Sequence, residues 1–160
     1  MAAMQSGAAS VAALFLAALP DTGGALAQDA SKPPQIDCAS GFDTLRIAAF
    51  NIAGAAGSAE EDGFEIVRIN SPAGQTPPWR AELGFTTPWH PAHPAVTLRT
   101  LRLQVTGVWT ADSKVCGYSG ADKTAALAAE MKAGDKALTD ASRDEVEKRN
   151  SQRSPLQSPH

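Results

Sequence analysis

Short apolar segments alternate with loops rich in proline and glycine through residues 44–120, and this pattern limits the fold more than any other feature. Successive side chains on a strand point to opposite faces, so brief alternating segments between turn residues are typical of β-structure. Ala81–Thr87 shows the cleanest alternation and predicts a half-buried strand. The predicted strands are Thr44–Ile52, Phe64–Asn70, Ala81–Thr87, Val96–Trp109 and Lys114–Tyr118.

We expect these strands to form a mostly β domain over residues 44–120, a small antiparallel β-sandwich or barrel. The apolar positions change parity at Arg99-Thr100, which predicts a bulge there or a turn that splits the segment into two strands. No helical period interrupts the region, so the sheet must bury its own apolar faces.

The N-terminus, residues 1–27, is predicted to be a secretory signal peptide. The apolar run Val11–Leu19 has the length of a signal-peptide core and is too short to span a bilayer. The small residues of Ala25–Ala27 fit a signal peptidase, which places cleavage before Gln28. The alternative is a buried alanine-rich helix of the mature protein. After cleavage we expect a linker over residues 28–43 and no stable membrane anchor, with the protein periplasmic or secreted.

Two cysteines, Cys38 and Cys116, are the only ones in the sequence. An even pair in an exported protein predicts one disulfide, which would tie the start of the β-domain to its last strand. Two buried free thiols are the alternative. A metal site is disfavoured, because neither cysteine has a CxxC partner or a neighbouring histidine.

The composition changes after residue 120 to a charged segment rich in helix-forming residues. We expect a helical tail over residues 121–149 that is interrupted near Gly134 and docks loosely or not at all. Ser142–Glu145 (SRDE) resembles a capping box that would open a second short helix. Residues 150–160 are predicted to be disordered.

The stretch Leu45–Asn51 (LRIAAFN) resembles the opening strand of the endonuclease/exonuclease/phosphatase family, in which a strand-end asparagine serves a metal-bound phosphate site. The resemblance ends at Asn51. The family's Gln-Glu pair and Ser-Asp-His triplet are missing from this sequence. We therefore interpret Asn51 as an ordinary polar residue of a strand.

Four side chains on proline-stiffened loops are the candidate binding residues: Trp79, Trp89, His90 and His93. Rigid aromatic groups lose little conformational entropy when a partner binds, which favours a contact surface. Two histidines three residues apart also occur in metal sites, but Pro91 and Pro94 forbid a regular helix here. The alternative structural role is that both tryptophans cover the core.

The formal net charge of −3 gives no electrostatic reason to expect nucleic acid as a partner. The sequence has no glycine-rich phosphate loop, and we expect no cofactor and no catalytic residues. The predicted function is a non-enzymatic binding or accessory module of a bacterial envelope, with a protein as its partner. The alternatives are a small metal-binding protein or hydrolase that uses His90 and His93, and an inhibitor of an exported enzyme.

Overall fold

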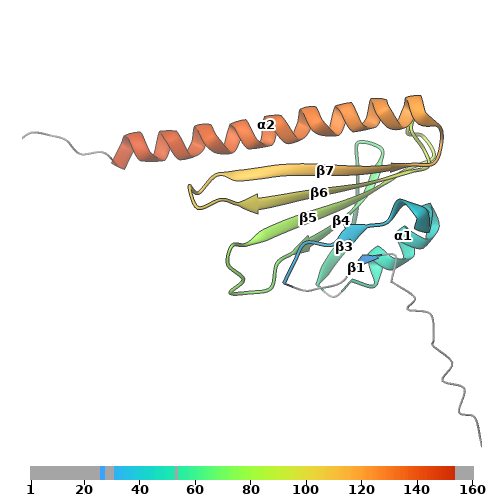
Figure 1. Ribbon diagram of the computed structural model, residues 1–160, viewed down its shortest axis with the longest axis horizontal. Coiled ribbons are helices and arrows are strands. Elements are labelled where there is room, and N and C mark those ends of the chain that lie inside the picture. The colour runs from blue at the N-terminus through green and yellow to red at the C-terminus, as the bar shows by residue number, and fades with distance from the viewer. Residues whose placement is uncertain (1–25, 28–30, 53, 154–160) are drawn as a thin grey trace, which may run out of the picture.

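The computed structural model describes residues 26–27, 31–52 and 54–153. In this part of the chain a five-stranded antiparallel sheet lies between helices (Figure 1). The elements are, in chain order, β1 (Leu26–Ala27), β2 (Gln35–Ile36), a 3-10 helix (Cys38–Ser40), α1 (Phe42–Phe50), β3 (Ala55–Glu61), β4 (Phe64–Asn70), β5 (Trp79–Thr86), β6 (Ala95–Leu103), β7 (Trp109–Gly117) and α2 (Ala121–Arg153).

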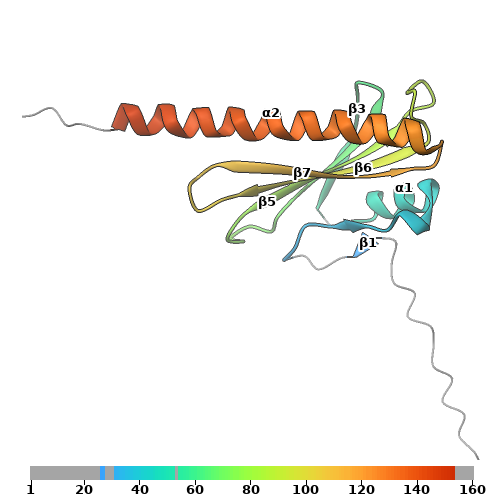
Figure 2. The same ribbon diagram turned by 45° about the horizontal axis from the view of Figure 1, so that its top comes forward.

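The five long strands occur in the sheet in their chain order, β3-β4-β5-β6-β7, and each runs antiparallel to its neighbours. Helix α1 and the short β1–β2 ladder lie on one side of the sheet, and α2 lies on the other side along β7 (Figure 1 and Figure 2). The prediction of a mostly β fold, an antiparallel sheet followed by a C-terminal helix, is confirmed. The sheet is open, with β3 and β7 at its edges, and is not closed into a barrel.

The main core lies on the face of the sheet that α1 covers. Leu83 in β5 pairs with Val67 in β4 and with Leu98 in β6, so alternate residues of the central strands share this face. The buried residues of this core are Ile36, Leu45, Ala49, Val67, Ile69, Trp79, Ala81, Leu83, Phe85, Val96, Leu98 and Cys116.

The prediction of a first strand over residues 44–52 is wrong, because most of this segment belongs to α1. Leu45 and Ala49 are completely buried, whereas Ile47 between them is 64% exposed. A strand would place all three side chains on one face, but the 3.6-residue period of a helix turns Ile47 away. The resemblance of Leu45–Asn51 to the opening strand of a nuclease therefore does not extend to its structure.

Strand β3 occupies a region in which the sequence analysis predicts no strand. Its sequence, AAGSAEE, has no apolar alternation, and its register with β4 shifts between Ala56 and Ala59. The hairpin turn into β4 is made by Asp62 and Gly63, whose φ angles are 50° and 80°. Positive φ at both turn positions matches the twist of a tight hairpin, and an Asp-Gly pair favours it.

The predicted long strand Val96–Trp109 is two strands, β6 and the start of β7. The change of parity near Arg99 needs no bulge, because β6 is regular and is covered on both faces. Val96 and Leu98 face α1, whereas Leu101 and Leu103 lie on the α2 side. The chain reverses after Leu103, where Gln104 N–H donates to the Val108 carbonyl over 2.9 Å.

The predicted disulfide between Cys38 and Cys116 is present, with 5.2 Å between the two Cα atoms. It joins the 3-10 helix that precedes α1 to β7, and Cys116 is 1% exposed within the core. A structural disulfide fits an oxidising compartment.

Much of the predicted linker, residues 28–43, is folded against the sheet. Ile36 is buried, and its carbonyl accepts a hydrogen bond of 2.7 Å from Lys114 Nζ. Burial of the apolar Ile36 side chain explains why this segment docks. The prediction of a linker was based on the polar residues before Ile36. The predicted signal peptide lies outside the described residues, except for Leu26–Ala27, which form β1.

The C-terminal segment is one continuous helix of 33 residues that docks on the sheet, which corrects the prediction of a broken, loosely attached tail. Gly134 does not interrupt α2. It makes room for the Arg99 side chain, whose Nη2 lies 2.9 Å from the position that a Cβ would occupy. Ser142 lies inside the helix and not at its start, so the predicted capping box does not form. The helix extends to Arg153, beyond the boundary predicted at residue 149.

Helix α2 covers the exposed edge of the sheet by hydrogen bonding to β7. The backbone N–H groups of Trp109 and Ala111 donate to Ser142 Oγ (2.9 Å) and Thr139 Oγ1 (3.1 Å). Ser113 Oγ donates to Asp135 Oδ1 over 2.8 Å. The helical residues recur at intervals of three and four, so they share one face of α2. Unpaired edge groups invite association with other strands, and these bonds satisfy them.

Replacing Thr139 with valine is expected to destabilise the protein by about 1–2 kcal/mol, because the partly buried N–H of Ala111 loses its acceptor while the side-chain shape is kept. Hydrogen exchange should show faster exchange at the Ala111 amide. The exposed Ala137, replaced with valine, is the control. Unchanged exchange at Ala111 in Thr139→Val would contradict the edge-covering role.

Candidate binding surface

The β5–β6 loop, residues 87–94, carries three of the four predicted binding residues and is held firmly at its base. Thr86 Oγ1 accepts a hydrogen bond from Ala95 N–H (2.8 Å) and donates to the Ala95 carbonyl (3.0 Å). Inside the loop, His90 N–H donates to the Thr87 carbonyl over 3.0 Å, and His93 N–H donates to the His90 carbonyl over 2.9 Å. The loop is therefore preorganised by its own hydrogen bonds.

His90 lies on the α2 side of the sheet. Its ring centroid is 4.6 Å from that of Phe64, and its Nδ1 accepts a hydrogen bond of 3.1 Å from Ala92 N–H. Its ring also lies over Gly63 in the β3–β4 turn. This side chain fixes the loop against the neighbouring hairpin.

His93 lies on the α1 side. Its ring meets Phe42 edge-on at 5.4 Å, and its Nδ1 is 2.8 Å from the Thr86 carbonyl. The structure thus places His90 and His93 against different helical layers and does not bring them to one point. Among the residues that the structure describes, no group of three or more His, Cys, Asp or Glu side chains is arranged to hold a metal ion.

The two predicted tryptophans lie at opposite ends of β5 and have opposite environments. Trp79 begins the strand and is 6% exposed, whereas Trp89 lies in the loop beyond the other end and is 87% exposed. Trp79 belongs to the core, which agrees with the alternative prediction that the tryptophans cover the core. The four candidates therefore do not form one surface, and Trp89 is the one that faces solvent.

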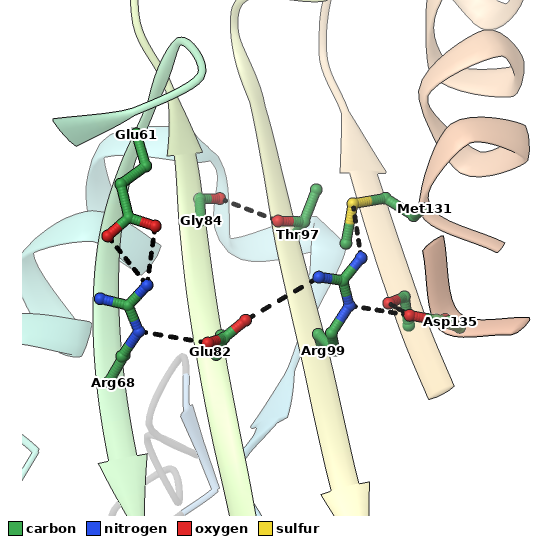
Figure 3. Close-up of polar contacts among 9 residues, drawn as sticks. Glu61, Arg68, Glu82, Gly84, Thr97, Arg99, Met131 and Asp135 are labelled. Carbon is green, nitrogen blue, oxygen red and sulfur yellow. Dashed lines mark hydrogen bonds and ion pairs between the residues drawn. The ribbon is translucent and has the colours of Figure 1, made fainter. Parts of the chain in front are cut away.

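A row of alternating charges crosses the part of the sheet that α2 leaves open (Figure 3). Arg68 Nη2 lies 2.8 Å from Glu61 Oε2, and Arg68 Nε lies 3.2 Å from Glu82 Oε1. Hydrogen bonding to Glu61, and then to Glu82, raises the pKa of Arg68 above its ordinary value. The Arg68 side chain is 43% exposed, and Glu61 and Glu82 are 47% and 30% exposed, so solvent screens both pairs and each contributes little to stability.

The row continues from Glu82 to α2. Arg99 Nη1 lies 3.9 Å from Glu82 Oε2, and Arg99 Nε lies 2.8 Å from Asp135 Oδ1. Asp135 is 7% exposed, so this end of the row is buried and positions the helix. We call the five side chains the charged row: Glu61, Arg68, Glu82, Arg99 and Asp135.

A groove of about 200 Å³ lies above the charged row, between the β3–β4 hairpin and α2. Phe64, Ile66 and Met131 supply its apolar surface, and Asp62 and Glu130 stand on its two walls. Phe64 also contacts His90, so the groove and the β5–β6 loop share a wall. His90, which lies beside the groove, is engaged in holding the loop.

Sequence reasoning missed the charged row, because its members come from four strands and a helix and only the strand register aligns them. The burial of Trp79 did have a signal. Trp79 has the same parity as Ala81, Leu83 and Phe85, the apolar face of the predicted strand.

No protein-family model matches the chain, and neither does any curated protein or solved structure. No helix in the described part of the chain combines the length and the apolarity needed to cross a bilayer. The function is therefore inferred from the geometry of the described residues.

Proposed function

We propose that the protein is a non-enzymatic binding or accessory module of a bacterial envelope, periplasmic or secreted, that contacts a protein partner through Trp89. The observation that carries this proposal is the 87% exposure of Trp89 on a loop whose backbone and histidines are tied down internally. The predicted signal peptide and the disulfide support export, since structural disulfides persist in oxidising compartments.

A single exposed tryptophan on a rigid loop has the properties of a binding hot spot. Tryptophan is enriched at the centres of protein interfaces, where it is fully desolvated by the partner. Burying a large apolar side chain contributes about 2–3 kcal/mol. Because the loop is already ordered, little of this gain is lost to ordering it on binding.

Replacing Trp89 with alanine is expected to weaken partner binding by about 2 kcal/mol, or roughly thirtyfold, without changing the melting temperature. The assay is co-purification of the tagged protein with a partner from the extracytoplasmic fraction, followed by titration of that partner. Val105→Ala is the matched control, because Val105 is a fully exposed apolar side chain in the β6–β7 turn.

The proposal fails if Trp89→Ala and Val105→Ala bind the partner as tightly as the unaltered protein. A partner that is itself an exported enzyme, and that loses activity in the complex, would identify the module as an inhibitor.

A further inference from the structure

Two adjoining hollows lie on the α1 side of the sheet, over the end that α1 does not reach. One, of about 480 Å³, lies between the N-terminal segment and the β4–β5 loop, with Trp79 in its lining. The other, of about 420 Å³, lies over β6 and β7. Gln35 and Arg102 line both, so Arg102 stands where the two hollows meet.

The described lining residues of these hollows include more basic than acidic side chains, although the whole chain has a net charge of −3. Arg102 and Lys32 line the first hollow, and none of the described residues in its lining is acidic. Lys114 and Arg102 line the second, where Asp112 is the one acidic residue among those that the structure describes. Arg102 is exposed, and none of the described carboxylates forms an ion pair with it.

Trp79 lines the first hollow with part of its aromatic side chain. Its side chain is largely buried, and its indole Nε1–H has no acceptor among the described residues. A buried donor without an acceptor is costly, and most such groups in folded proteins are satisfied. Pro77 and Pro78 extend the apolar lining beside it.

The walls of the first hollow are already in place. Ser71 N–H donates to the Trp79 carbonyl over 3.0 Å, and Trp79 N–H donates to Ser71 Oγ over 3.2 Å. Leu103 N–H donates to the Pro78 carbonyl over 3.2 Å, which ties the loop to the end of β6. A ligand would therefore meet a largely formed site, as is usual for small-molecule pockets.

We propose that this hollow binds a small organic carboxylate. The Arg102 guanidinium matches a carboxylate with two parallel donors, which a neutral ligand cannot use equally well. The apolar body of the ligand would lie on Trp79 and the two prolines. The apolar lining favours an organic carboxylate over inorganic phosphate. This site is separate from Trp89 and does not depend on the proposed partner binding.

The test is a titration of the isotope-labelled protein with benzoate, followed through the indole N–H signals in NMR spectra. Trp79→Phe assigns the Trp79 signal. We expect this signal to shift with benzoate and not with benzyl alcohol, which has the same ring without the charge. The Trp89 signal should stay in place.

Arg102→Gln is expected to weaken benzoate binding at least tenfold, whereas Lys132→Gln, the same charge change on the outer side of α2, should leave it within twofold. Equal shifts with benzoate and benzyl alcohol would overturn the proposal, as would an Arg102→Gln variant that binds benzoate as the unaltered protein does. A Trp79 signal that does not respond to benzoate would overturn it as well.

Discussion

Replacing Cys38 and Cys116 together with alanine is expected to lower the free energy of unfolding by about 4 kcal/mol. The disulfide closes a loop with a sequence separation of 78. In the chain-entropy model a loop of this length restricts the unfolded chain enough to stabilise the fold by about 4–5 kcal/mol. Loss of the bond also removes the covalent link between β7 and the segment that precedes α1.

Urea denaturation of the unaltered protein and the double variant measures this loss. The unaltered protein unfolded and refolded with reductant present is the control, and its stability should approach that of the variant. A difference below about 1 kcal/mol between oxidised protein and variant would show that the disulfide contributes little to the fold.

Replacing Asp135 with alanine is expected to cost about 3 kcal/mol, the second largest effect. The Asp135 carboxylate is 7% exposed and accepts hydrogen bonds from Arg99 Nε and Ser113 Oγ, each over 2.8 Å. Its removal leaves the partly buried Arg99 guanidinium without its closer counter-charge, with only Glu82 at 3.9 Å, and this costs more than the pair itself contributes. The contact between α2 and β6 should loosen as a result.

Asp140 provides the matched control in the same helix. It pairs with Lys136 and with Arg143, but these contacts are exposed to solvent. Asp140→Ala should therefore leave the urea midpoint nearly unchanged, in contrast to Asp135→Ala. Equal midpoints for the two variants would contradict the view that Asp135 anchors α2 to the sheet.

The strands that could be predicted from the sequence are those with a buried apolar face. β4 and β5 carry alternating apolar residues, and the observed strands match the predicted segments closely. β3 could not be predicted in this way, because an edge strand with small and charged residues has no apolar alternation. The disulfide could be predicted because the chain has a single pair of cysteines.

Helix α1 was mistaken for a strand because nine residues are short enough for both patterns to fit. Leu45, Ile47 and Ala49 satisfy a strand period, and Leu45 with Ala49 also satisfies a helical one. Packing decides between them, since the sheet offers a surface for Leu45 and Ala49 and leaves Ile47 in solvent. Local sequence does not carry that information.

Docking of α2 depends on polar groups, which hydrophobic patterning does not detect. Leu127 and Met131 pack on the sheet in the first half of the helix, but the second half is held by Asp135, Thr139 and Ser142. A search for hydroxyl and carboxylate side chains at helical spacing could have indicated this face. The sequence predicted that Trp89 lies on a stiff loop. Only the fold shows that Trp89 is exposed whereas Trp79 is buried.

Photo-crosslinking in living cells tests the central claim most directly, because it reports contacts of the protein in its own compartment. A photoreactive phenylalanine derivative replaces Trp89 in one variant and Val105 in another, and both positions are exposed loop tips. We expect position 89 to give one discrete protein adduct and position 105 to give none of that size. No adduct from position 89, or the same adducts from both positions, would contradict a functional contact at Trp89.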